Sequence, residues 1–194
     1  MAIVSSIKLI TAATTNAVSL AEAKTHLRVD SDDEDTYIST LIVSAQRQVE
    51  AFTNRCLSDT TYELHLSSFP AGGIVLPFSP LKTLTSVKYY DGDNNQRTWV
   101  EDTDYFYTIS EEPPMIRYLD GTESVYESRM DNVIVRFIAG YTSPAVIPPG
   151  LQHSIKLLLT DLYEMRTDLP REKFTAWKSL AYPYRVFHST TENT

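Results

Sequence analysis

The stretch VDSDDEDTYISTLIVSAQRQVEAFTN, residues 29–54, places five carboxylates directly before a helical pattern of apolar residues. From Ile38 to Phe52 apolar side chains recur at three- and four-residue spacing, which predicts a long amphipathic helix over residues 33–53. Asn54 follows as a residue that tolerates the left-handed conformation in which helices often end. The acids before the helix could bind a metal, catalyse a reaction or only begin the helix.

The acidic run has the pattern of a helix start. Ser31 is placed to cap the helix and Glu34 stands three residues later, so the two can form a capping box. The positive end of the helix dipole favours the other carboxylates in this turn. A calcium loop counted from Asp30 would need Gly and Glu where Asp35 and Leu41 stand. We therefore expect neither a metal site nor catalytic carboxylates here.

Two further helices are predicted on either side of this one. Ser19 and Glu22 form a second capping-box pattern, which predicts a short helix over residues 20–27. Pro148 and Pro149 suit a helix start, and an apolar stripe follows over residues 149–166. The three helices can form a small bundle in which the third packs against the second.

Between these helices, in residues 60–141, apolar residues recur at every second position. TYELHLS alternates polar and apolar residues, and VIVRFIAGY is rich in β-branched and aromatic residues. Shorter candidate strands lie between them, at Ile74 to Leu76, Thr85 to Tyr90, Arg97 to Val100, Tyr105 to Ile109 and Met115 to Tyr118. Strands this short and close together connect as antiparallel hairpins. The sequence therefore predicts an α+β fold, with an antiparallel sheet, sandwich or barrel inserted into a helical bundle.

The chain divides into a predicted body, residues 1–166, and a C-terminal arm, residues 167–194. The arm has no sustained period and contains five aromatic residues, Phe174, Trp177, Tyr182, Tyr184 and Phe187. Residues 166–194 carry three acids and five bases, whereas residues 1–165 carry 22 acids and 12 bases. Aromatics at this density either complete the core of their own subunit or form a surface for a partner.

Composition excludes several classes of function. With 42% apolar and 22% charged residues the chain has an ordinary globular balance, and it contains no membrane-spanning apolar run and no secretory signal pattern. The only cysteine, Cys56, cannot form an internal disulfide, and we expect it to be buried and inert. A formal net charge of −8 repels nucleic acid rather than gathering it.

No catalytic, cofactor-binding or metal-binding motif is visible. The four histidines lie in four different segments, and His65 falls on the polar side of a predicted strand, where we expect it on the surface. The six glycines form no phosphate-binding run. The absence of such motifs beside an aromatic arm favours an interaction protein over an enzyme.

Four stretches of sequence resemble the head-tail connector, or adaptor, proteins of long-tailed bacteriophages and gene transfer agents. The longest is SLAEAKTHLRVDSDDEDTYISTLIVSAQRQVEAFTNRCL, residues 19–57. VRFIAGY (135–141), IPPGLQHSIKLLLTDLYEMR (147–166) and SLAYPYRV (179–186) follow in the family's order. The chain departs from the family pattern at Asn54, where Gly is frequent, and at Cys56 and Tyr182, where smaller residues are frequent.

The resemblance implies a structural virion protein with no catalytic role and no cofactor. Identical subunits would form a ring, as a dodecamer in the virion neck, between the portal and the tail or stopper proteins. DNA would pass through the central channel without specific binding. The protein would be made in the host cytoplasm and would not enter a membrane. The arm would anchor in the portal through Phe174, Trp177, Leu180, Tyr182, Pro183, Tyr184, Arg185, Val186 and Phe187.

Two other functions are compatible with the residues. The chain could be a different phage assembly protein. It could also be a small acid-dependent hydrolase, which would require a cleft containing a carboxyl group of raised pKa. A DNA-binding factor would need a basic face that the charge counts do not provide.

Overall fold

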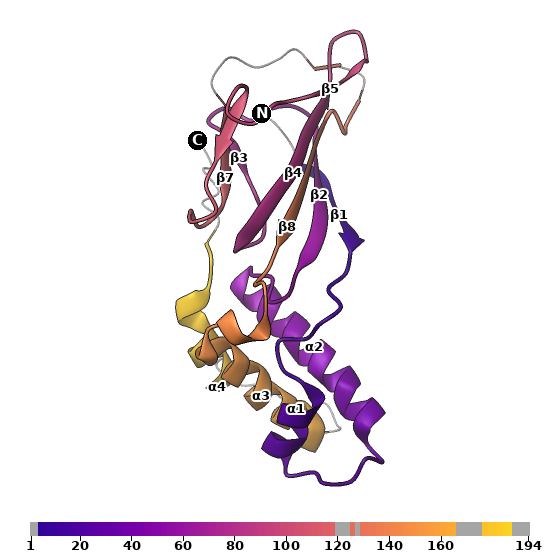
Figure 1. Cartoon of the computed structure of the whole chain (residues 1–194), viewed down its shortest axis with the longest axis vertical. Helices are drawn as coiled ribbons and strands as arrows, with labels where there is room; N and C mark the ends of the chain where they lie inside the picture. The colour runs from indigo at the N-terminus through magenta and orange to yellow at the C-terminus, as the bar shows by residue number, and fades with distance from the viewer. Residues whose placement is uncertain (1–3, 119–124, 127–128, 166–175, 188–194) are drawn as a thin grey trace. The chain divides into compact units, whose positions relative to one another are not determined.

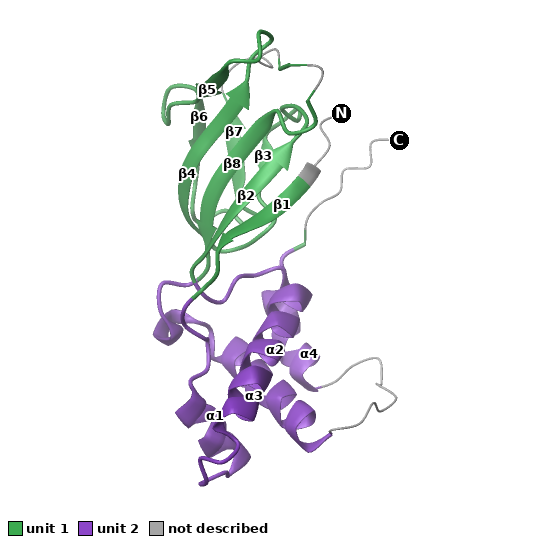
Figure 2. Ribbon diagram, turned by 90° about the vertical axis from the view of Figure 1, so that its right-hand side faces the viewer, with its two compact units in different colours: residues 1–13, 59–140, 187–194 green, residues 14–58, 141–186 purple. Residues whose placement is uncertain are grey.

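The computed structural model describes residues 4–118, 125–126, 129–165 and 176–187. Two compact units are present (Figure 2). We call residues 1–13, 59–140 and 187–194 the β unit, and residues 14–58 and 141–186 the helical unit. The expected α+β class is confirmed. The predicted boundary between body and arm at residue 166 lies outside the described residues.

The helical unit contains the three predicted helices and a fourth short one (Figure 1). Its elements are α1 (Leu20–Leu27), α2 (Asp35–Thr53), the 3₁₀ turn η1 (Pro144–Val146), α3 (Pro149–Glu164), α4 (Ala176–Ala181) and the 3₁₀ turn η2 (Tyr182–Tyr184). Helix α3 begins at Pro149, as expected, and α2 ends at Asn54 in the left-handed conformation, with φ 55°. Among the described residues no helix is long and apolar enough to cross a membrane.

The core of the helical unit lies between α2 and α3. Ile38, Ile42 and Val49 on α2 are fully buried together with Leu151 and Ile155 on α3. Burying side chains of this size contributes roughly 1.5–3 kcal/mol each. The apolar spacing read from the sequence therefore identifies the buried faces of both helices, and their packing is confirmed.

The two expected capping boxes have different outcomes. At α1 the Ser19 hydroxyl accepts from the Glu22 backbone N–H at 3.3 Å, and the Glu22 carboxylate accepts from the Ser19 N–H at 2.9 Å. The box expected from Ser31 and Glu34 does not form. Glu34 itself occupies the N-cap of α2, with no side-chain cap hydrogen bond, and its carboxylate accepts from the Tyr163 hydroxyl of α3.

Competing partners explain this difference. The Ser31 hydroxyl accepts from the Asp33 backbone N–H two residues on, in a local turn. Lys24 of α1 binds Asp32 at 2.5 Å and Asp35 at 2.8 Å, which ties the acidic run to the preceding helix. The carboxylates thus join helices in addition to beginning one.

The β unit consists of two antiparallel sheets. The five-stranded sheet has the order β1 (Val4–Thr11), β2 (Thr60–Leu66), β8 (Val133–Ala139), β4 (Leu81–Tyr90) and β5 (Gln96–Thr98). The three-stranded sheet has the order β3 (Ile74–Val75), β7 (Met115–Tyr118) and β6 (Tyr105–Tyr107). Buried residues from both sheets, among them Leu64, Val135 and Ile116, form the core of this unit.

Two features of the β unit were not predicted correctly. Strand β1 was missed. His65 was expected on the surface but is only 4% exposed, and among the described residues neither of its ring nitrogens has a hydrogen-bond partner. Its neighbour Glu63 is 3.5 Å away and also binds Arg136 of β8. Because β2 is an interior strand, His65 lies between its paired residues Ser6 of β1 and Ile134 of β8, which shield it more than the alternation in its own sequence indicates.

Candidate interaction site on the helical unit

Residues 176–187, which we call the C-terminal segment, include the last residues of the helical unit, up to Val186, and the following Phe187. Trp177 and Ala181 of α4 are buried in the core of the unit. The Ser154 hydroxyl of α3 donates to the Trp177 carbonyl at 2.8 Å. The Trp177 ring meets the Phe52 ring edge-on, with centroids 5.5 Å apart. One side of the segment is therefore part of its own subunit's core.

The corner after α2 holds the end of the segment. The Thr53 carbonyl accepts from the Val186 N–H at 2.9 Å, and the Asn54 amide donates to the Val186 carbonyl at 2.8 Å. Arg55 donates through Nε to the Tyr184 carbonyl at 2.5 Å. Three consecutive residues thus fix two backbone positions more than a hundred residues away in sequence.

Close packing at the start of α3 sets the position of Tyr184. A β-carbon at Gly150 would lie 2.8 Å from a ring carbon of Tyr184. This is closer than van der Waals contact allows, so the ring occupies space that any larger residue at position 150 would need. Glycine at this position allows the C-terminal segment to lie against α3.

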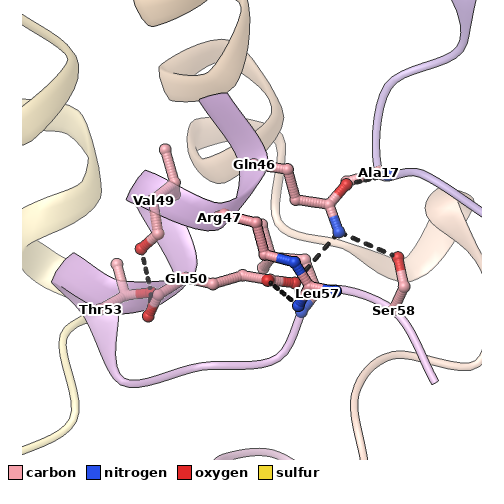
Figure 3. A network of polar contacts seen from close by, with 8 residues as sticks. All are labelled: Ala17, Gln46, Arg47, Val49, Glu50, Thr53, Leu57 and Ser58. Atoms are coloured by element: carbon pink, nitrogen blue, oxygen red, sulfur yellow. Dashed lines mark hydrogen bonds and ion pairs between the residues drawn. The ribbon is translucent and has the colours of Figure 1, made fainter. Parts of the chain in front are cut away.

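A polar network fixes the chain on both sides of α2 (Figure 3). The buried Gln46 accepts from the Ala17 N–H at 2.8 Å and donates to Glu50 at 3.0 Å. Glu50 also accepts from the Leu57 N–H at 2.9 Å and from Arg47 at 3.0 Å. A buried carboxylate requires such partners, since an unpaired one would be costly. The network positions the corner that holds the C-terminal segment.

The other side of the segment faces solvent. Leu180 is 37% and Tyr182 51% exposed, and Pro183, Arg185 and Phe187 are also exposed. The Arg185 guanidinium lies 5.2 Å from the centre of the Phe52 ring. We call Leu180, Tyr182, Pro183 and Arg185 the exposed face.

The structure divides the nine residues expected to dock on a partner. Trp177 and Val186 are buried and Tyr184 is half-buried, because they anchor the segment on its own subunit. Phe174 lies outside the described residues. The remaining five are exposed. Docking itself stays a prediction.

Two titratable residues of α1, His26 and Glu22, have pKa values that depart from their ordinary ones. Burial, together with the nearby His153 and Lys156, lowers the pKa of His26, while the Ser19 N–H and hydroxyl lower that of Glu22. His26 and Lys156 line a shallow hollow of about 360 Å³. The described residues include no cluster of three potential metal ligands. No observation supports the carboxyl of raised pKa that a hydrolase would need.

Sequence reasoning did not identify the anchoring role of Thr53, Asn54 and Arg55. Asn54 was read only as a helix stop, although its amide also holds the C-terminal segment. Their position directly after a long helix is the only signal in the sequence, and it does not reveal a partner so distant along the chain.

Residues 17–103 match the sequence model of the family described as phage gp6-like head-tail connector protein. This range covers α1, α2, the corner after α2 and strands β2 to β5. Among curated proteins nothing matches.

Solved structures with the same fold come from gene transfer agent (GTA) particles. A chain of the neck of an empty GTA particle, computed with C6 symmetry, gives a TM-score of 0.81 at 21% identity, covering 97% of this chain and 100% of that one. A chain of a native GTA virion gives a TM-score of 0.78 at 22% identity, covering 94% of this chain and 96% of that one. A chain of a native GTA neck, computed with C12 symmetry, gives a TM-score of 0.74 at 20% identity, covering 97% of this chain and 100% of that one.

The resemblance visible in the sequence is thus confirmed by a family match and by a shared fold over nearly the whole chain. The match to the phage gp6-like head-tail connector proteins covers residues 17–103, which is less than half of the chain.

Proposed function

We propose that the chain is a structural connector subunit of a virion neck, acting between the portal and the tail or stopper proteins of a phage or gene transfer agent. The observation that carries the proposal is the connector-family match over residues 17–103, which lies within a fold shared with GTA neck chains. The role requires no catalysis and no cofactor. The subunit would be made in the host cytoplasm and would end in the neck.

A ring of identical subunits follows from the same proposal. GTA necks that contain chains of this fold were computed with C6 and C12 symmetry. Twelve copies of this chain would match that symmetry, and closed rings need two different complementary faces on each copy. DNA would pass through the centre of the ring. The acidic balance of the chain supports passage without tight binding, because neutral or negative walls do not hold phosphates.

The exposed face is proposed as the portal-docking surface. Its supports are Trp177, which lies in the core of the helical unit, and Val186, which is buried and bound to Thr53 by a backbone hydrogen bond. A segment that is already positioned loses less conformational entropy on binding than one that orders at that moment. Tyr182 and Arg185 are residue types that often dominate binding energy.

The test combines substitutions that change the exposed face but leave the anchors intact. Leu180→Ser, Tyr182→Ser and Arg185→Glu together should leave the chain folded and abolish its incorporation into heads that carry a portal. The readout is co-sedimentation with heads purified from a strain that lacks this protein. The matched control is Val43→Ser on α2, an equally exposed apolar position, which should incorporate normally.

Normal incorporation of the triple variant would contradict the docking surface. If the unmodified chain instead joins tails, or another assembly intermediate without a portal, it is a different phage assembly protein. Removing residues 170–194 should also prevent incorporation, but it deletes the buried Trp177 as well, so the surface variant is the more direct test.

A further inference from the structure

The two sheets of the β unit differ in width, which leaves part of one face uncovered. Trp99, directly after β5, lies 5.3 Å from the Tyr118 ring of β7 and 6.3 Å from the Tyr105 ring of β6. The narrow sheet therefore covers the β4–β5 side of the wide sheet. At the other side, the Tyr62 ring of β2 is covered by Phe78 at 4.5 Å. Strand β1 lies one strand further out.

Apolar side chains of β1 continue the core-facing side of the sheet beyond this cover. Ile7 is paired with Leu64, and Leu9 with Tyr62, both of which are buried on that side. Directly paired residues in antiparallel strands share a face. Yet Ile7 is 43% and Leu9 53% exposed, and Ile10, at a shift in the pairing register, is exposed too. We call Ile7, Leu9 and Ile10 the β1 margin.

The free edge of β1 is poorly suited to adding another strand. Its pairing with β2 shifts register between Val4 and Ser6 and again between Leu9 and Thr11. Lys8 is exposed in the middle of the strand. Bulges and edge lysines are two ways in which proteins prevent open-ended sheet pairing. The β1 margin is therefore suited to side-chain packing against a surface rather than to extending the sheet.

A second apolar surface lies at the opposite edge of the β unit. Val100 is 59%, Ile109 58% and Phe106 of β6 41% exposed, and we call these three residues the β6 rim. Between Val100 and Glu112 the sequence has five acids and no base. Strand β1 has one base, Lys8, and no acid. Arg117, paired with Phe106 across the sheet, binds one of these acids, Glu111, at 2.9 Å, so acids still outnumber bases at the rim. The two edges are thus both apolar and differ in charge.

We propose that the β1 margin of one subunit packs against the β6 rim of a neighbouring copy of the same chain. The inference rests on the proposed function, because it assigns the two complementary faces that a closed ring of identical subunits needs. The shared apolar character supplies the burial. Lys8 points to the opposite face from Ile7 and Leu9, so it acts at the border of the contact, where its charge near Glu101 and Asp102 of the neighbour favours this pairing over margin to margin or rim to rim.

Mixed cross-linking of single-cysteine variants tests this pairing. Leu9→Cys carries the thiol on the margin and Ile109→Cys carries it on the rim, and one variant is mass-tagged. A flexible bis-maleimide should produce mixed dimers about tenfold more efficiently than either variant alone. Ser44→Cys, exposed on α2, paired with either variant is the matched control. The native Cys56 is buried, so the unmodified chain measures the background.

The charge of Lys8 provides a second measurement. Lys8→Glu should reduce the mixed cross-linking about tenfold, and Glu101→Lys combined with Asp102→Lys on the partner variant should restore it. Cross-linking of Leu9→Cys with itself at the same efficiency would overturn the proposal, because it would show a symmetric contact. Equal yields from the Ser44→Cys control would overturn it as well.

The same variants separate this inference from the proposed function. If the chain joins portal-bearing heads but the two thiols do not cross-link there, the pairing is wrong and the connector role stands. If they cross-link in solution but the chain never joins heads, the pairing stands and the connector role fails. Failure of both measurements rejects both proposals.

Discussion

At the start of α1, the Ser19 hydroxyl and the Glu22 carboxylate satisfy each other's backbone N–H groups. Ser19→Ala should lower the free energy of unfolding of the helical unit by about 1 kcal/mol. Ser31→Ala is the matched control, because Ser31 forms only a local turn, and it should change stability by much less. Denaturant unfolding followed by circular dichroism measures both, and equal losses would contradict the distinction.

The same contact makes the free energy of unfolding depend on pH in the acidic range. The Ser19 N–H and hydroxyl hold the pKa of Glu22 below its ordinary value of 4.5. Its contribution is therefore complete above pH 4.5 and is lost as the pH falls through the lower folded pKa. The stability difference between the parent chain and Glu22→Gln, measured by unfolding from neutral pH downward, should shrink only in that acidic range.

His26 should produce a second pH dependence nearer neutrality. Burial, His153 and Lys156 lower its pKa below 6.5, and among the described residues Glu22 is the acid that lines the same hollow. The folded state thus favours the neutral ring, so stability is complete above pH 6.5 and declines as the pH falls through the folded pKa. In the His26→Gln variant, the free energy of unfolding should depend less on pH over this range. If its dependence on pH is unchanged, His26 is not the cause.

Among the elements, α3 and the C-terminal segment depend on each other through Gly150. Gly150→Ala should loosen the segment, because the added carbon meets the Tyr184 ring, and so raise amide exchange over residues 177–186. In a Tyr184→Ala background the same change should be neutral or stabilising by up to about 1 kcal/mol, because Ala favours helix. If Gly150→Ala changes stability in the same direction in both backgrounds, the contact between position 150 and the Tyr184 ring is unimportant.

The elements that sequence reasoning located are those with strong internal periods. Helices α1, α2 and α3 lie close to their expected residues because burial of one face dictates their spacing, and strands β2 to β8 overlap the expected strands. Strand β1 was missed although Ile7, Leu9 and the polar Lys8 between them alternate as a strand would. Its apolar residues remain exposed, so the alternation does not mark a buried face, and a buried face is what identifies a strand in a sequence.

The interaction site was predictable only in part, and the reason lies in distance along the chain. Composition indicated that the C-terminal aromatics need a covering surface. It could not divide them between anchors and an exposed face, because that depends on the Thr53 and Asn54 contacts with Val186, more than a hundred residues away. The capping role expected for Ser31 was wrong for a similar reason, since Glu34 binds Tyr163 instead.

For the whole molecule, the net charge of −8 predicts weak affinity for DNA. The chain should not shift duplex DNA in a gel at low salt, where electrostatic binding is strongest. Replacing the rim acids Glu101 and Asp102 by Lys should increase any residual affinity. Tight binding by the unmodified chain, lost when its bases are neutralised, would contradict passage of DNA without retention.

Both units are assembled from separate stretches of the chain, and this has a consequence for biosynthesis. During translation α2 leaves the ribosome early, but α3 and α4, which pack against it, follow only after the intervening strands have been made. Because domains fold as units during synthesis, the first helices must wait with their apolar face open. A nascent chain stalled before Trp177 would therefore be a client for chaperones, and the exposed face would become available only on a finished helical unit.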